Sequence, residues 1–447
     1  MRKRWLGIGA PIVALTLVIA LARHVPAKAG AASEAVPSAS SVAALAAEEE
    51  ALSVKQRFTQ PTPSAMADLD LSRIALEKGA PVAPLPERRV ARLTLEPRLQ
   101  KLATSYMQAK HLPEAVVVMI DVATGDVLAY ASHLEKGPAR DLAVEATAPA
   151  ASVFKIVTGT ALVDSAGLSP DQKECYSGGE QRITAQDLEA DPVRDKWCST
   201  LAGALGRSLN TVFARLALRH LKPERLDETA RTLGFGDRLA FDVPVQPSAL
   251  RIPEEPLPYA RTAAGFWNTT LSPVHAAWLS AVFARGGEAV RPRIVAEVVD
   301  GSGKSLYTMP APVVRRVIPA SVAASVTQMM DRTVAEGTSY RAFHDIKGTS
   351  FLAGVPVAGK TGTLTDGEKQ RYYTWFTGFA PSHPQPGQRQ VAIAALVVNG
   401  PVWRVKANVL AREMLRGYFS NENVPGVTFP EVHAEPSNAV AAVRRKK

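Results

Sequence analysis

Apolar positions along the chain predict a mixed α and β fold. Leu95, Leu99 and Leu102 fall on one face of a predicted helix, because their spacing follows the helical repeat. Two apolar stretches then flank a short polar turn at residues 123–126, which predicts a β-hairpin over residues 114–133. From residue 150 to 285 the pattern is mainly helical. A helix-rich lobe is therefore expected after the first strands.

Strand patterns return late in the chain. They cover residues 355–365, 372–382 and 390–400, and a closing helix is predicted over residues 407–419. The early hairpin and the three late strands all need partners, so we expect them to share one antiparallel, five-stranded sheet. The predicted fold class is α/β (α+β): a sheet covered by helices, with a helical lobe inserted between its two halves.

The two ends of the chain differ from this body. Residues 1–30 contain an uncharged apolar run from Leu6 to Ala22 behind a basic start, which predicts a signal anchor in the inner membrane. A cleaved signal peptide is the alternative, since Ala27-Lys28-Ala29 resembles a cleavage site. Either way, the body is expected in the periplasm or extracytoplasmic space. Residues 31–90 are predicted to be an Ala/Pro-rich stalk, 91–420 the folded domain, and 421–447 a flexible basic tail.

Composition and charge exclude some classes of function. The chain has 447 residues, of which 46% are hydrophobic and 21% charged, which is typical of a globular protein. Its net charge of +10 comes partly from basic clusters at the two ends. No basic stripe with interleaved aromatic residues is found, so we expect no nucleic-acid partner.

The cysteine count bears on the compartment. An exported chain meets oxidising conditions, where Cys175 and Cys198 are expected to form a disulfide. Two buried thiols are the alternative. A metal site would need further ligands near these cysteines. The sequence also has no His-Glu-x-x-His pair and no phosphate-binding Gly-rich loop that ends in Lys-Ser/Thr, so neither a metal nor another cofactor is expected.

Ser152 and Lys155 are the first candidates for chemistry. On a helix, residues three apart share a face, so the hydroxyl and the amine can meet. A lysine removes a proton from serine only when it is neutral, which requires a pKa well below 10.4. Burial among apolar neighbours and a second nearby cation both lower the pKa of a lysine. Taken alone, this spacing also fits an ordinary exposed serine and lysine.

Two later motifs change this interpretation. One contains Ser208 and Asn210, and the other is the run Lys360, Thr361, Gly362 and Thr363. Separately, the first is typical of a helix cap and the second of a strand or turn. Together they offer a hydroxyl that relays a proton, an amide that holds a peptide, and a cation for a carboxylate.

The three motifs, in this order, resemble the signature of the penicillin-binding transpeptidase family. The resemblance covers roughly residues 91–420 and implies a penicillin-binding transpeptidase or β-lactamase-like fold. It implies that a D-Ala-D-Ala stem peptide acylates Ser152, that Lys155 accepts the proton, and that Ser208 passes a proton to the leaving D-Ala. Asn210 would position the donor, Lys360, Thr361 and Thr363 would hold the terminal carboxylate, and Gly362 would leave room for the substrate.

The resemblance also implies a monofunctional enzyme that β-lactams inhibit covalently. Fewer than seventy residues separate the apolar segment from the body, too few for a glycosyltransferase domain, so a glycosyltransferase partner is expected. One departure concerns the nucleophile: relatives often have Pro-Gly before it, whereas Ala150-Ala151 stands here.

Three other functions remain open on the sequence. A D-Ala-D-Ala carboxypeptidase or endopeptidase would use the same acylation but release the acyl group to water. A sensor would bind β-lactam or wall peptide without turnover. A β-lactamase is disfavoured, because no Glu-x-x-Leu-Asn stretch follows Ser208.

Overall fold

A computed structural model describes residues 63–179 and 182–420 of the chain. The predicted membrane segment, the first part of the predicted stalk and the predicted basic tail lie outside these residues. Within the described ranges, no helix has the length and apolar character needed to span a bilayer.

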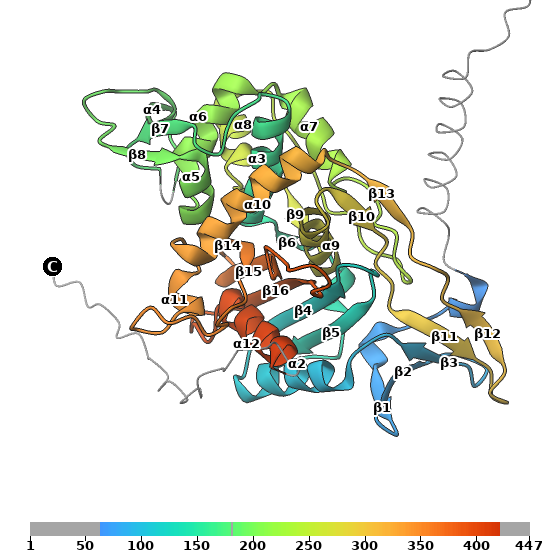
Figure 1. Cartoon of the computed structure of the whole chain (residues 1–447). Coiled ribbons are helices and arrows are strands. Elements are labelled where there is room, and N and C mark those ends of the chain that lie inside the picture. Colours follow the sequence, from blue (N-terminus) through green and yellow to red (C-terminus); the bar gives the residue numbers. More distant parts are fainter. Residues whose placement is uncertain (1–62, 180–181, 421–447) are drawn as a thin grey trace, which may run out of the picture. The chain divides into compact units, whose positions relative to one another are not determined.

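The main sheet contains five antiparallel strands in the order β14-β15-β16-β4-β5 (Figure 1). The early hairpin supplies β4 (Glu114–Asp121) and β5 (Val127–Leu134). The late strands are β14 (Ala358–Asp366), β15 (Arg371–Ala380) and β16 (Val391–Asn399). β16 pairs with β4, so strands about 270 residues apart in the sequence (391 against 121) become neighbours. The predicted antiparallel five-stranded sheet is confirmed.

Both faces of this sheet are buried, because side chains alternate between its faces with a period of two. On β15, Phe376 belongs to one core with α2 (Pro97–Ala109) and α12 (Ala407–Phe419). Its neighbour Trp375 belongs to the other core, with α9 (Pro273–Ala284). α9 is apolar on all sides and is buried from Pro273 to Phe283.

The helical lobe lies between the two halves of the main sheet in the chain. Its helices, in chain order, are α3 (Lys155–Asp164), α4 (Ala185–Leu188), α5 (Leu201–Arg207), α6 (Asn210–His220), α7 (Pro223–Thr232), α8 (Pro256–Ala263), α9, α10 (Ala320–Ala335) and α11 (Tyr340–Phe343). Short 3₁₀ turns are η1 (Ser64–Met66), η2 (Leu71–Arg73), η3 (Leu142–Val144) and η4 (Ala151–Phe154). α10 packs against α5 and β14, and so connects the lobe to the edge of the sheet.

A second five-stranded sheet corrects the predicted stalk. Its order is β1-β2-β3-β11-β12, with β1 (Ala75–Glu77), β2 (Ala80–Pro84), β3 (Val90–Leu93), β11 (Val295–Val299) and β12 (Ser305–Thr308). Residues 64–84 are therefore folded, although we predicted a stalk to residue 90. The strands are only three to five residues long and the partner of β3 is β11, about 200 residues later, so the local pattern was too weak to reveal them.

Three two-stranded sheets complete the described fold: β6 (Ala148–Pro149) with β9 (Thr270–Leu271), β7 (Lys173–Tyr176) with β8 (Trp197–Thr200), and β10 (Glu288–Val290) with β13 (Val314–Arg316). Cys175 of β7 stands opposite Cys198 of β8, and a disulfide joins them.

Candidate active site

Ser152 lies in η4, directly before α3, and Lys155 is the first residue of α3. In a 3₁₀ turn, side chains three residues apart are eclipsed. The Oγ of Ser152 and the Nζ of Lys155 are accordingly 2.9 Å apart. The predicted pair is therefore in contact.

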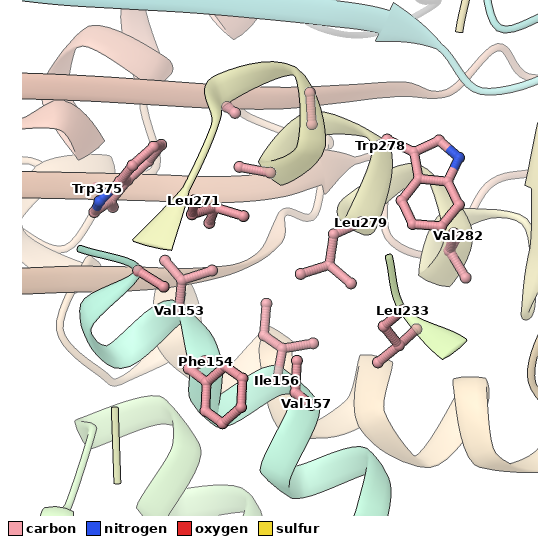
Figure 2. Packing of buried hydrophobic residues seen from close by; sticks show 14 of the residues in the cluster. Val153, Phe154, Ile156, Val157, Leu233, Leu271, Trp278, Leu279, Val282 and Trp375 are labelled. Carbon is pink, nitrogen blue, oxygen red and sulfur yellow. The ribbon is translucent and has the colours of Figure 1, made fainter. Parts of the chain in front are cut away.

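Apolar packing fixes this pair in place. Val153, Phe154, Ile156 and Val157 are fully buried, and Figure 2 shows them among the residues of the core. Phe154 meets the ring of Phe235 edge-on, with centroids 5.3 Å apart. Because each buried side chain of this size contributes about 1.5–3 kcal/mol, η4 and α3 form a firm support for the two polar side chains.

The turn into η4 contains Ala151, which stands where the resemblance led us to expect the Gly of a Pro-Gly pair. Ala151 has a φ of 49°, in the left-handed region that favours glycine. Gly265 makes room for it: a Cβ on Gly265 would lie 2.5 Å from the carbonyl oxygen of Ala151. The left-handed turn is therefore present with an alanine in it, and the backbone of this turn packs closely against Gly265.

The amine of Lys155 has three polar neighbours. Its Nζ lies 2.9 Å from the Oγ of Ser152, 2.7 Å from the Oδ1 of Asn210 and 2.5 Å from the carbonyl oxygen of Ala264. The Nδ2 of Asn210 donates to the carbonyl of Gly179, which directs Oδ1 toward Lys155. Two of the three neighbours can therefore only accept. A neutral amine would use its two N–H groups on them and leave its lone pair for the hydroxyl of Ser152.

Burial and charge both favour this neutral state. Burial is the larger cause and the nearby Lys360 the smaller one, and together they hold the pKa of Lys155 well below its usual value. Lys360 is itself fully buried, which lowers its pKa to about 7. Its Nζ donates to the carbonyl of Thr361, 2.8 Å away. Burial and a second nearby cation, the two effects that we expected to lower the pKa of this lysine, are therefore both present.

The second motif lies between two helices. Ser208 follows α5 with a φ of 60° and a ψ of 40°, which turns the chain sharply before α6 begins at Asn210. Neither side chain caps α6, because its cap is Leu209 and receives no side-chain hydrogen bond. Ser208 and Asn210 instead line a cavity together with Ser152.

The third motif forms the free edge of the main sheet, on β14. Lys360 and Gly362 are buried, whereas Thr361, Thr363 and Thr365 alternate with them and line the cavity. A Cβ on Gly362 would come within 3.3 Å of the carbonyl of Ala150. This glycine therefore allows β14 and η4 to approach each other. The three predicted motifs meet around one cavity of about 870 Å³.

Several residues at this site were missed on the sequence. The carbonyls of Ala264 and Gly179 complete the surroundings of Lys155 and Asn210, and the hydroxyl of Thr338 lies 2.6 Å from that of Thr361. Backbone carbonyls carry no residue signature, so no sequence signal could identify them. Arg207 directly precedes the second motif and also lines the cavity, so its position beside Ser208 was a usable signal.

A buried arginine connects α6 to the disulfide-bonded hairpin. Arg215 of α6 forms an ion pair with Asp195, 2.6 Å away, and donates to the carbonyls of Cys175, Asp187 and Glu189. It therefore ties β7 of the disulfide-bonded hairpin, and residues of the segment that leads from β7 to β8, to the helix that begins with Asn210. In the described ranges, no group of three or more His, Cys, Asp or Glu side chains could hold a metal ion.

Comparison with known proteins identifies the family. The profile of the penicillin binding protein transpeptidase domain matches residues 115–413. The chain belongs to the penicillin-binding protein transpeptidase family. The match covers most of the chain and includes all three motifs, so the family that the motifs resembled is confirmed.

Two relatives and one assembly illustrate the similarity. Peptidoglycan D,D-transpeptidase PbpA of Mycobacterium tuberculosis (strain CDC 1551 / Oshkosh) is 28% identical over 347 residues, which cover 69% of this chain and 67% of that protein. The imipenem acyl-enzyme of penicillin-binding protein A from M. tuberculosis shares the fold, with a TM-score of 0.61 and 23% identity over 74% of this chain and 79% of that one. A peptidoglycan synthase complex that coordinates polymerization and crosslinking contains a chain with the same fold, with a TM-score of 0.61 and 21% identity over 75% of this chain and 64% of that one.

Proposed function

We propose that this protein is a peptidoglycan D,D-transpeptidase that cross-links stem peptides through an acyl-enzyme on Ser152, and that penicillin inhibits it covalently. The observation that carries the proposal is the arrangement around Lys155. Two obligate acceptors occupy the N–H groups of a neutral amine, so its lone pair faces a serine 2.9 Å away. Family membership and the name of the similar relative support the same activity.

In the proposed acylation, Lys155 takes the hydroxyl proton as the Oγ of Ser152 attacks the carbonyl between the last two D-Ala residues. The backbone N–H groups of Ser152 and Thr363 stabilise the oxyanion. The C–N bond then breaks, and the terminal D-Ala leaves as an amine after Ser208 relays the proton to it. Asn210 orients the donor, and Lys360, Thr361 and Thr363 bind the terminal carboxylate.

In the second half of the reaction, an amine from another stem peptide attacks the acyl-enzyme. A new amide bond forms and the Ser152 hydroxyl is restored, so the cross-link is made with no energy source other than the peptide bond that was broken. Water in place of the amine would give a carboxypeptidase. The two reactions share every step before this one.

We further propose that the protein acts outside the cytoplasm, anchored by its N-terminal segment. The disulfide between Cys175 and Cys198 supports an oxidising compartment. A glycosyltransferase partner would supply the glycan strands; the synthase complex that contains a similar fold gives a precedent for such an assembly.

Penicillin labelling tests the proposal. We expect a fluorescent penicillin to label the protein and Ser152→Ala to abolish the labelling, because no acyl bond can then form. Thermal unfolding of the variant checks that the fold is intact. Undiminished labelling of Ser152→Ala would contradict the assignment of the nucleophile. Mass spectrometry of products from a donor peptide and an amine acceptor then separates transfer from hydrolysis.

A further inference from the structure

The disulfide between β7 and β8 lies on the surface of the molecule. Cys175 and Cys198 stand opposite each other in the two strands, and both residues are exposed. The next pair along the strands, Glu174 and Ser199, is buried, so the hairpin turns its other face to the protein. The chain contains no other cysteine. Exposed disulfides are reached by thiolates and are reduced more readily than buried ones.

β7 and the residues that follow it lie along one face of α6. Three side chains of α6 that are spaced four residues apart share this face and donate to residues 174–179. The pairs, in order along α6, are Thr211 with the carbonyl of Gly178 (3.0 Å), Arg215 with the carbonyl of Cys175 (3.0 Å), and Arg219 with the carboxylate of Glu174 (2.9 Å). Residues 174–179 therefore run antiparallel to the helix and end beside its first turn.

The end of this segment orients Asn210. The Nδ2 of Asn210 donates to the carbonyl of Gly179, 3.1 Å away, and its Oδ1 accepts from the Nζ of Lys155 at 2.7 Å. Gly179 has a φ of 74° and packs so closely on α6 that a Cβ on it would overlap the hydroxyl of Thr211. The direction of the Asn210 amide therefore depends on the position of the backbone at Gly179.

The disulfide is close to this contact along the chain. Only three residues separate Cys175 from Gly179. A two-stranded hairpin is marginally stable in water by itself, and β7 and β8 pair over four residues each. The covalent bond therefore fixes the place of β7, and through Gly179 it fixes the amide of Asn210 beside Lys155.

We propose that this disulfide is a site of thiol–disulfide exchange that controls the acylation of Ser152 through Asn210. An external dithiol reduces it: one thiolate attacks the sulfur of Cys175 or Cys198, the S–S bond breaks, and a mixed disulfide forms. The second thiolate then displaces the attacked cysteine, so the protein gains two electrons and two protons and the dithiol becomes a disulfide. The inference rests on the proposed function, because it concerns the same nucleophile.

Reduction should change the surroundings of Lys155. The oxygen of Asn210 accepts from its amine and so stabilises the charged form. Once the bridge is open, the amide is no longer held in this direction, and the pKa of Lys155 should fall further. The charged Lys360, the carbonyl of Ala264 and the hydroxyl of Ser152 face this amine from other elements and stay in place. Acylation should still become slower, because the amine is held less precisely toward the hydroxyl.

Reduction of the intact protein by dithiothreitol tests the inference. Alkylation followed by mass spectrometry counts the thiols that form. Second-order labelling rates with a fluorescent penicillin are measured from about pH 5 to about pH 9 on the oxidised protein, the reduced protein and the double variant Cys175→Ser/Cys198→Ser. The double variant lacks the bridge, so it is the matched control for any action of dithiothreitol elsewhere on the protein.

We expect the reduced protein to be labelled about three- to tenfold more slowly at the plateau of its pH profile, as the loss of one oriented hydrogen bond allows. Its rising limb should move to lower pH, and reoxidation should restore both properties. The double variant should match the reduced protein and be unaffected by dithiothreitol. Equal rates of the oxidised and reduced proteins would overturn the inference. A limb that moves to higher pH would do the same, because it would indicate entry of water to the amine instead of loss of the amide oxygen.

A structural measurement keeps the test independent of the proposed function. Hydrogen exchange, followed by mass spectrometry, should become faster in residues 173–179 and at the start of α6 after reduction, and should change little in the main sheet. Unchanged exchange in residues 173–179 and α6 would overturn the inference. An oxidised protein that penicillin does not label at Ser152 would instead contradict the proposed function. Thermal unfolding of both forms checks that the remaining fold is intact.

Discussion

The chemistry of this site depends on the state of one residue, Lys155. Its amine is fully buried, near the ring of Phe213, and burial is the larger cause of its lowered pKa. A charged ammonium in such a place would lose its hydration. Lys360 adds repulsion from the same buried region, so two lysines make each other's charged forms less favourable. The site thus keeps a base available near neutral pH.

The pH dependence of acylation tests this account. The acylation rate should rise with pH as Lys155 loses its proton, because only the neutral amine can accept the proton of Ser152. Lys360→Gln removes the repelling charge, so the pKa of Lys155 should increase and the rising limb should move to higher pH. The shift should be modest, since burial remains. Second-order labelling rates with a fluorescent penicillin from about pH 5 to about pH 9 measure it.

The position of the limb separates this effect from binding. Lys360→Gln should also lower the overall rate, since Lys360 is proposed to bind the carboxylate. An unshifted limb in Lys360→Gln would show that its charge does not act on Lys155. A limb that moves to lower pH would contradict the sign of the interaction.

At the residue scale, the sequence predicted which catalytic side chains would meet, but not the backbone groups that surround them. Ser152 and Lys155 could be paired because helical spacing alone brings them together. The carbonyl of Ala264 lies 109 residues from Lys155 in the chain, and its place beside the amine depends on how α8 and its following turn pack. Any residue type has a backbone carbonyl, so the sequence does not indicate which carbonyl makes this contact.

Among the elements, α6 connects the site to the disulfide-bonded hairpin. Asn210 begins this helix and Arg215 lies one turn further, fully buried. The guanidinium of Arg215 is satisfied by Asp195 and by three backbone carbonyls. A buried charge of this kind requires its partners, because an unpaired one would be very costly. α6 therefore holds the hairpin rigidly beside the cavity.

Asp195→Asn tests this connection. Arg215 is the main cause that lowers the pKa of Asp195 to about 2, so the carboxylate stabilises the fold above its unfolded pKa of about 4. We expect the variant to lose on the order of 2 kcal/mol of unfolding free energy at pH 7. The loss should shrink as pH falls from about 4 toward about 2, because the wild-type carboxylate then becomes protonated as well. Urea unfolding at several pH values measures it.

A matched control separates burial from charge. Asp227 pairs with Arg231 within α7, where both side chains are substantially exposed. Asp227→Asn should cost less than about 1 kcal/mol, because water screens exposed pairs. Equal losses of unfolding free energy in the two variants would show that the buried ion pair stabilises the fold no more than the exposed one.

At the scale of the whole molecule, two sheets each combine strands from distant parts of the chain. β4 and β5 from the early part complete the sheet that β14, β15 and β16 begin. β1, β2 and β3 complete a second sheet with β11 and β12. Both sheets pair segments about 200 to 270 residues apart, so neither sheet can form until most of the domain has been made.

A truncation tests the second of these sheets. A chain that starts at residue 95 lacks β3 and leaves the edge of β11 without its partner, with the apolar contacts of Ala91 and Leu93 removed. We expect it to unfold at a lower temperature and to aggregate more readily than a chain that starts at residue 63, because an unpaired edge invites other strands. Thermal unfolding and light scattering compare them. Equal melting temperatures would contradict a structural role for residues 63–94.

The sequence by itself determined the family, the main secondary structure and the three motifs. It could do so because helical and strand periods are local, and because the motif residues carry chemistry that few other side chains offer. The five strands of the main sheet were found for the same reason.

Only the tertiary structure decided how these parts meet. It brought Lys360 close enough to Lys155 to lower its pKa, supplied the carbonyls of Ala264 and Gly179, and folded part of the segment that had looked like a stalk. Each of these depends on contacts between residues far apart in the chain, formed by packing that involves the whole core. A local pattern in the sequence does not indicate such contacts, so the complete burial of the two lysines is seen only in the folded molecule.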